Sequence, residues 1–205
     1  AGIFILKTMQ TPLPVPSPQP QILDTSDWQT YRNEKFGFEV KYPSQKASVQ
    51  EVKKQTGYFD RTSFRVAQVD TSFNQESNLP TKTPRGTIEI YVDEDSAWLK
   101  SCLASEVISK SMPDEIKNIN GVEFSLYDES SAATGSRANE KSYRTIYGGK
   151  CYRIQSFVIW TSIDFYRGAT TGESVTQEEI QKEQKLVQAQ VDFNSQILST
   201  FRFVK

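Results

Sequence analysis

The sequence contains two cysteines, Cys102 and Cys151, whose thiols are the first side chains to consider for chemistry. A catalytic thiol needs an activating histidine or a second cysteine in a C-x-x-C pair, and the 205 residues contain neither. We therefore expect both cysteines to be structural. Outside the cytoplasm they would normally form one disulfide, and the alternative is two separate buried thiols.

Three consecutive acidic residues, Asp93, Glu94 and Asp95, are the best candidate for a metal site, because hard cations bind clustered carboxylates. The run lacks the remaining ligands and the glycine of an EF-hand loop. Acidic residues that precede a helix more often accept hydrogen bonds from its first backbone N–H groups. We therefore predict a capping role for this run, and neither a metal nor another cofactor in the protein.

Signatures of other catalytic centres are missing. The absence of histidine removes the commonest general base, the commonest transition-metal ligand and any triad built on imidazole. The sequence has no G-x-S-x-G motif, and no S-x-x-K motif with its usual partners. A hydrolase would have to use carboxylates that only the fold brings together, so we predict no catalytic residues.

Aromatic residues make up 12% of the chain, and an exposed ring could stack against a sugar or a peptide. Aromatic side chains at strand spacing more often belong to a core. The candidates for a stacking platform are Trp28, Tyr58, Phe59, Tyr147 and Trp160.

The balance of charge argues against a nucleic-acid partner. There are 24 basic and 25 acidic residues, for a net charge of −1, without a long run of like charge. A surface that binds a polyanion needs a concentration of Lys and Arg. The hydrophobic content of 37% is enough for one folded domain with a substantial core.

The first residues of the sequence predict how this domain is attached to a membrane. Residues 1–7, AGIFILK, resemble the end of a membrane anchor or signal segment, with a cloning remnant or a buried strand as alternatives. Residues 8–23 are rich in proline and predict an extended linker. We expect a single domain over residues 24–205, held away from a membrane surface by this linker.

Alternation of apolar and polar residues predicts a series of short strands, each with one buried face. Besides a hairpin within Trp28–Pro43, these strands are Phe64–Val66, Thr87–Val92, Val122–Leu126, Tyr143–Tyr147, Lys150–Trp160 and Phe201–Phe203. Segment 45–57 could be a short helix or an edge strand. Segments 70–84 and 130–142 have the composition of loops, the second of them flexible.

Two helices are predicted from apolar stripes and caps. The first follows Asp93–Ser96, and the second follows a loop around Gly168 and Gly172 and begins at a capping box of Thr176 and Glu179. The apolar stripe of the first helix is Trp98, Leu99, Cys102, Leu103 and Val107. That of the second helix is Ile180, Val187, Val191 and Leu198. Because strands and helices do not alternate regularly, we predict an α+β fold, an antiparallel sheet covered by helices.

The two ends of the domain resemble a known family. W-x-x-Y-x-N followed by G-F-x-x-x-YP near the start, and I-L-S-T-F-x-F at the end, resemble extracytoplasmic bacterial proteins of the PsbP-like type. The matching residues are Trp28, Tyr31, Asn33, Gly37, Phe38, Tyr42 and Pro43, and Ile197, Leu198, Ser199, Thr200, Phe201 and Phe203. The resemblance implies an α/β/α sandwich. The family includes extrinsic subunits of the oxygen-evolving photosystem and, on the same fold, a Ran-binding import factor, and it has no shared catalytic centre.

Together these features predict a non-enzymatic domain, tethered outside a bacterial membrane, that serves as a binding or accessory subunit of an envelope assembly. Its partner would be another envelope protein. A hydrolase of cell-wall or extracellular polymer is the first alternative and would need a cleft with two facing carboxylates. A small-ligand carrier is the second, and would need an apolar cavity between sheet and helices.

Overall fold

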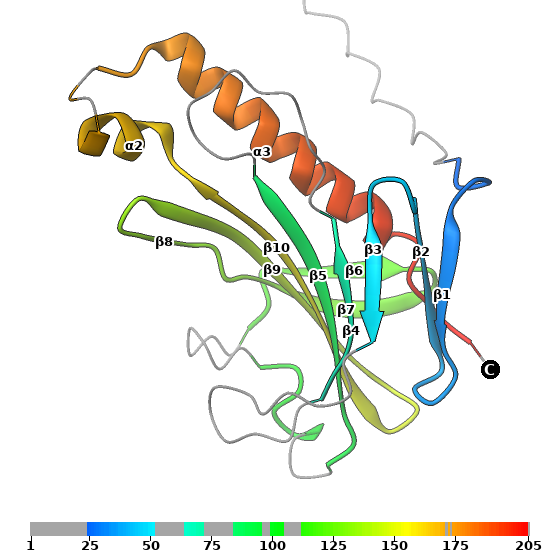
Figure 1. Cartoon of the computed structure of the whole chain (residues 1–205). Coiled ribbons are helices and arrows are strands. Elements are labelled where there is room, and N and C mark those ends of the chain that lie inside the picture. Colours follow the sequence, from blue (N-terminus) through cyan, green and yellow to red (C-terminus); the bar gives the residue numbers. More distant parts are fainter. Residues whose placement is uncertain are drawn as a thin grey trace, which may run out of the picture.

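The computed structural model describes residues 24–51, 64–71, 84–95, 99–104, 112–170, 172 and 174–204. Within these ranges the chain forms two β-sheets and two helices, and every strand pairing is antiparallel (Figure 1). The predicted α+β class is confirmed. Residues 1–23, on which the anchor and linker predictions depend, lie outside the described ranges, as do Tyr58, Phe59 and Trp98.

The smaller sheet joins the beginning of the domain to its end. It has the order β1-β2-β11, with β1 at Gln29–Asn33, β2 at Phe38–Tyr42 and β11 at Arg202–Phe203. In the β1–β2 turn, the Asn33 Oδ1 accepts from the Phe36 N–H at 3.1 Å, and Gly37 takes a φ of +64° that favours glycine. The predicted hairpin therefore forms, and the last strand completes its sheet.

The larger sheet has the order β3-β4-β5-β10-β9-β7-β6, with β8 beside β9. Its strands are β3 (Ser48–Glu51), β4 (Phe64–Asp70), β5 (Arg85–Asp93), β6 (Glu115–Ile119), β7 (Val122–Asp128), β8 (Ser131–Ala133), β9 (Ser136–Tyr147) and β10 (Lys150–Thr161). The long β9–β10 hairpin turns at Gly148 and Gly149, whose φ values of +55° and +75° suit a two-residue turn. This confirms the predicted hairpin.

Two helices follow the sheet strands, α2 at Ile163–Thr170 and α3 at Gln177–Leu198. The capping box at the start of α3 is present, since the Glu179 N–H donates to Thr176 Oγ1 and the Glu179 carboxylate accepts from the Thr176 N–H. In Figure 1, α3 crosses one face of the larger sheet. In the part of the chain that the structure describes, no helix is long and apolar enough to cross a membrane.

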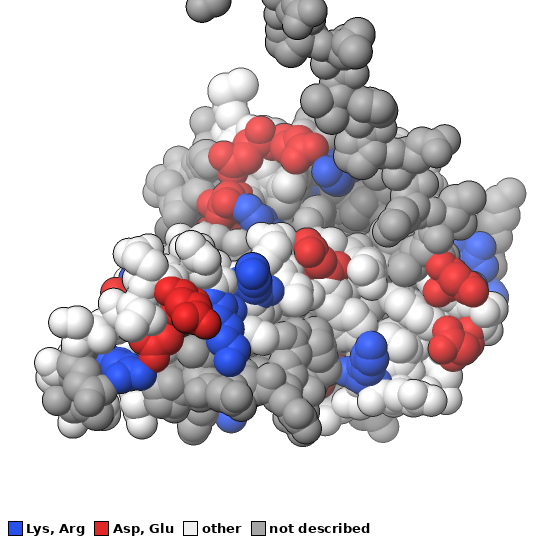
Figure 2. All heavy atoms as spheres, turned by 90° about the horizontal axis from the view of Figure 1, so that it is seen from above, with Lys and Arg blue, Asp and Glu red and all other residues white. Residues whose placement is uncertain are grey.

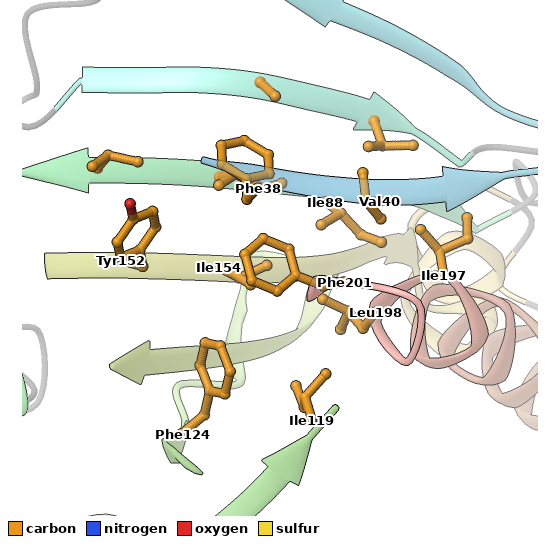
Figure 3. Close-up of a cluster of buried hydrophobic side chains, with 14 of the residues drawn as sticks. Phe38, Val40, Ile88, Ile119, Phe124, Tyr152, Ile154, Ile197, Leu198 and Phe201 are labelled. Atoms are coloured by element: carbon orange, nitrogen blue, oxygen red, sulfur yellow. The ribbon is translucent and has the colours of Figure 1, made fainter. Parts of the chain in front are cut away.

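The core lies between the two sheets and the end of α3 (Figure 3). Phe38 and Val40 of β2 face Ile88 of β5 and Ile154 of β10, and Ile197 of α3 closes one side. Phe36, in the turn before β2, and Phe38 and Val40 of β2 are buried, while Tyr42 is half-buried. Aromatic and branched side chains fill this space.

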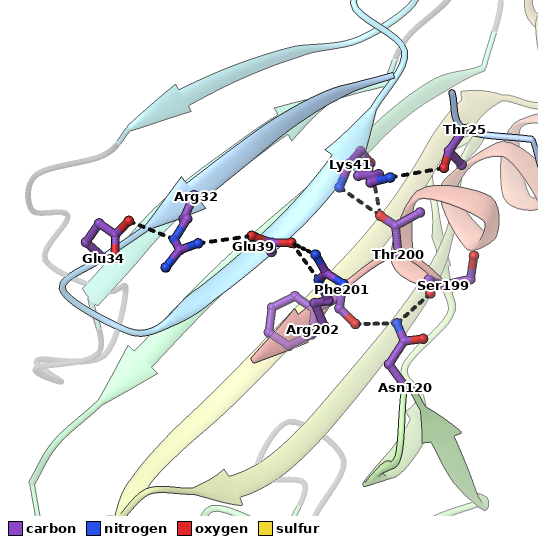
Figure 4. A network of polar contacts seen from close by, with 10 residues as sticks. All are labelled: Thr25, Arg32, Glu34, Glu39, Lys41, Asn120, Ser199, Thr200, Phe201 and Arg202. Atoms are coloured by element: carbon purple, nitrogen blue, oxygen red, sulfur yellow. Dashed lines mark hydrogen bonds and ion pairs between the residues drawn. The ribbon is translucent and has the colours of Figure 1, made fainter. Parts of the chain in front are cut away.

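Polar contacts lock the end of the chain against β2 (Figure 4). Thr200 Oγ1 accepts from the Lys41 N–H at 2.8 Å, and the buried Glu39 pairs with Arg202 at 2.5 Å. The Asn120 Nδ2 donates to the carbonyls of Ser199 and Phe201, at 2.8 and 2.7 Å. The segment that leads into β11 is therefore held from both sides.

The face that α3 buries differs from the predicted stripe. Its fully buried residues are Gln190, Phe193, Asn194, Ile197 and Leu198, whereas Ile180, Val187 and Val191 are half-buried. Gln190 and Asn194 are polar, and hydrogen bonds satisfy them. Gln190 Nε2 donates to the Thr71 carbonyl at 3.0 Å, and Asn194 Nδ2 donates to Ser156 Oγ at 3.0 Å.

Two predicted loops are wrong. Segment 130–142 is not flexible, because β8 and the first half of β9 form a hairpin there, with Thr134 and Gly135 at positive φ. The loop predicted around Gly168 and Gly172 is wrong at Gly168, which lies in α2, whereas Gly172 lies beyond the helix. Within segment 45–57, the described part contains β3, an edge strand. Segment 70–84 is described only at its ends, and the first predicted helix only over residues 99–104, which are mostly turn.

Candidate functional site

A disulfide between Cys102 and Cys151 fixes segment 99–104 to the larger sheet. Their Cα atoms are 5.7 Å apart, and Cys151 is the second residue of β10, where it lies opposite Ile146 of β9. The Cys102 sulfur also lies 3.5 Å from the Thr145 carbonyl oxygen. Thus a segment outside the strands is attached covalently at the end of the sheet that carries the β9–β10 turn. A disulfide is compatible with a location outside the cytoplasm.

Large apolar side chains are exposed at this same end. Leu103, Ile146 and Tyr147 are 44%, 43% and 42% exposed, and we call these three residues the tip surface. Ile146 and Tyr147 are consecutive in β9, so their side chains leave opposite faces of the sheet. The Tyr147 ring stacks on Phe203 with centroids 3.8 Å apart, which fixes its orientation. Leu103 follows Cys102 directly, so the disulfide restrains it. The tip surface therefore presents exposed apolar side chains on both faces of a restrained end of the sheet.

A buried ion pair lies beneath segment 99–104, on the face of the larger sheet opposite α3. The Arg144 Nη2 donates to Glu129 Oε1 at 2.9 Å, and the side chains of both residues are almost completely buried. The other guanidinium nitrogens donate to Ser142 Oγ at 3.0 Å and to the Ala104 carbonyl. Burial lowers the pKa of Arg144 from its usual value, against the opposing effect of Glu129. Arg144 thereby connects the sheet to segment 99–104.

A second carboxyl group, that of Glu140, adjoins this ion pair. The Glu129 N–H donates to the Glu140 carbonyl at 2.9 Å, so the two residues are opposite each other on neighbouring chain segments. The Gln155 Nε2 donates to Glu140 Oε1 at 3.2 Å. Burial, followed by the charge of Glu129, raises the pKa of Glu140 to about 7. The fold thus brings two carboxyl groups together, which no sequence motif indicated.

The acidic run Asp93, Glu94 and Asp95 does not converge on one point. Asp93 is buried and its Oδ1 accepts from the Asp95 N–H at 2.9 Å, while Glu94 pairs with Lys150. The Asp95 carbonyl accepts from the Leu99 N–H at 3.3 Å, as at the start of a helical turn. Among the residues described, no three His, Cys, Asp or Glu side chains are grouped to hold a metal ion.

Open hollows lie elsewhere on the described surface. One of about 560 Å³ lies between Trp160 and the side of α3 from Gln181 to Gln188, and one of about 370 Å³ lies between the β8–β9 turn and α2. Neither is lined by Glu129 or Glu140. Of the predicted stacking candidates, Trp160 lines the larger hollow, Tyr147 belongs to the tip surface, and Trp28 packs against the core.

Basic and acidic side chains are interspersed on the face of the molecule seen in Figure 2. Over the residues described on that face, neither sign of charge forms a continuous field. A surface of this kind gives little long-range attraction for a polyanion.

No family model matches the chain, and no curated protein matches it in sequence. Among solved structures, a protein of Bacteroides thetaiotaomicron is similar with a TM-score of 0.44 and 12% sequence identity. The similarity covers 87% of this chain and 49% of that protein, so this chain spans about half of its length. At this level the similarity supports no conclusion about function.

Proposed function

We propose that this protein is a non-enzymatic binding or accessory domain, tethered outside a bacterial membrane, and that the tip surface contacts another envelope protein. The observation that carries the proposal is the position of Leu103, Ile146 and Tyr147, which are exposed around a disulfide-restrained end of the sheet. Restrained apolar side chains lose little conformational entropy when a partner covers them. The disulfide also supports the extracytoplasmic location.

The PsbP-like relationship belongs to the same proposal. What supports it is that the two chain ends carrying the resemblance lie together, since β2 pairs with β11 and Phe38 stacks on Phe201. Membrane attachment rests on the apolar residues 1–7 and the proline-rich residues 8–23. A carrier function is less well supported, because the space between the sheets and α3 is filled with side chains.

Site-specific photocrosslinking in the native envelope would test the tip surface. A photoreactive residue at Ile146 should give a discrete adduct with one envelope protein, and Ile146→Asp should prevent co-purification of that protein. Ile159, which is 49% exposed in β10 at the other end of the same sheet, is the matched control position. Equal adducts at both positions, or none at Ile146, would contradict the proposal.

A polymer hydrolase is the second candidate, favoured by the backbone hydrogen bond that brings Glu129 and Glu140 opposite each other. Against it, the Glu129 side chain is fully buried and so cannot touch a polymer in this conformation. Incubation with purified peptidoglycan would test this function by release of new reducing ends. A rate of release that Glu140→Gln abolishes would favour the hydrolase over the binding domain.

A further inference from the structure

We propose that β6 is a self-complementary edge strand, through which two copies of this chain join their larger sheets side by side as an antiparallel dimer. The inference goes beyond the proposed binding function and does not depend on the tip surface. It rests on the exposure of β6, on the turn that follows it and on the order of its charges.

The strand β6 ends the larger sheet and is open to solvent. Among the described strands it pairs only with β7, and its residues 115–118 are all exposed, whereas Ile119 is buried. Ile116 is 53% exposed. The outer side of an edge strand presents backbone N–H and C=O groups that another strand can pair with.

The turn between β6 and β7 determines which backbone groups face outwards. Asn120 and Gly121 both have positive φ, +48° and +86°, and Ile119 lies directly opposite Val122. This is a two-residue turn of type I′, so Ile119 and Val122 exchange hydrogen bonds. Because hydrogen-bonded positions alternate along an antiparallel pair, the N–H and C=O groups of Ile116 point away from β7.

A two-fold axis at Ile116 brings the outward groups of two copies together. The Ile116 N–H of each copy then donates to the Ile116 carbonyl of the other, as in any hydrogen-bonded antiparallel pair. In the same register Asn118, whose backbone groups also point outwards, lies opposite Asp114 of the second copy. The pairing therefore extends over most of β6.

The charges of β6 select this register. Glu115 of each copy lies opposite Lys117 of the other, at positions where the side chains of antiparallel strands are closest. Sliding one copy by two residues, the smallest shift that keeps the backbone hydrogen bonds, places Glu115 opposite Glu115 or Lys117 opposite Lys117. Like charges directly opposite each other are destabilising, so both shifts are disfavoured.

The single lysine of β6 does not protect this edge. Edge strands often carry a lysine that repels a second strand, but here Lys117 already lies 3.2 Å from Glu115 of its own chain, and the dimer adds a second carboxylate opposite it. Ile116 would pack against Ile116 of the second copy and lose contact with water. Because β6 has only five residues, we expect a dimer that dissociates on dilution.

Sedimentation equilibrium over a range of concentrations tests the proposal with charge reversals. Lys117→Glu places carboxylates opposite each other at both symmetric contacts and should weaken the dimer about tenfold or more. Glu115→Lys should do the same with ammonium groups. The double variant Glu115→Lys with Lys117→Glu restores opposite charges in the same register and should dimerise as wild type does. These side chains are about half exposed, so the variants should fold normally.

A cysteine at position 116 tests the register itself. Residues in a hydrogen-bonded antiparallel pair have Cα atoms about 5.5 Å apart, within the range of a disulfide. Both native cysteines are already paired with each other, so the new thiol of Ile116→Cys has no competitor. Mild oxidation should give a covalent dimer, and Ile159→Cys, 49% exposed in the central strand β10, is the matched control.

Three results would overturn the proposal. The first is a wild-type chain that stays monomeric at about 1 mM, where even a weak specific dimer forms. The second is a dimer that both single charge reversals leave unchanged, or that the double variant fails to restore. The third is equal cross-linking at positions 116 and 159.

Discussion

The rings of Phe38 and Phe201 stack with their centroids 5.4 Å apart, although one residue is in the first hairpin and the other precedes the last strand. Both side chains are fully buried, and the Phe201 ring also meets Phe124 edge-on at 6.0 Å. Phe201→Ala should lower the free energy of unfolding by about 3–5 kcal/mol, through lost burial and a cavity. Urea unfolding would measure it. Phe165→Ala, at a position 43% exposed in α2, should cost much less, and equal losses would contradict this assignment of the core.

The helix α3 approaches β5 so closely at Gly86 that no side chain fits there. A Cβ atom at Gly86 would lie 2.2 Å from Gln190 Nε2 and 2.3 Å from Thr71 Oγ1. Gly86→Ala should therefore displace Gln190 from its buried hydrogen bonds and cost about 2 kcal/mol or more. In a Gln190→Ala background the same substitution should cost less, which a double-mutant cycle would reveal.

Gly168 offers the matched control for this prediction. It lies within α2, and a Cβ atom there would meet nothing within 4 Å. Gly168→Ala should raise stability by up to about 1 kcal/mol, because alanine is the better helix former. A similar loss at both glycines would show that crowding at Gly86 is not the cause.

Asp128 should make the stability depend on pH in the acid range. Burial alone would raise its pKa, but the hydrogen bonds from Lys141 and Ser130 outweigh burial and lower the pKa to about 2. Because the folded-state pKa is below the ordinary value of 3.8, this contribution is present above about pH 4 and is lost as pH falls towards 2. Urea midpoints of wild type and Asp128→Asn should differ near pH 6 and converge near pH 2. A constant difference would contradict the prediction, and Asp27→Asn is the exposed control.

The disulfide should be a main source of stability. It joins residues 49 positions apart, and in the chain-entropy model a loop of that length is worth about 4 kcal/mol. The reduced protein, or Cys102→Ser with Cys151→Ser, should unfold at a correspondingly lower urea concentration. Ellman titration of the unreduced, denatured protein should detect no thiol. Two titratable thiols would contradict the pairing.

Local sequence patterns were sufficient to predict many of the strands and the start of α3. The alternation in Thr87–Val92 and Lys150–Trp160, the glycine pair at 148 and 149, and the capping box at Thr176 predicted elements that the structure contains. Segment 130–142 was misjudged because its small and polar residues resemble a loop. There the hydrogen bonds of β8 and β9 are made with each other and with β10, and such pairing leaves no local signal.

The candidate site was harder to predict for the same reason. Glu129 and Glu140 meet only because the chain turns back between them, in the segment that reads as a loop. The buried amides of Gln190 and Asn194 were also missed, since apolar spacing cannot indicate a polar residue whose partners, such as Thr71, are distant in sequence. The exposure of Ile146 likewise depends on what covers each face of the sheet, and not on alternation within β9.

The pairing of β2 with β11 sets an order of events during synthesis. Glu39 and Arg202 are 163 positions apart, so a chain that emerges with its N-terminus first has made its opening hairpin long before the third strand exists. Until then the apolar face of that hairpin has no cover from Phe201. A nascent or partly exported chain should therefore depend on chaperones, and should be sensitive to proteases, until nearly its last described residue is free.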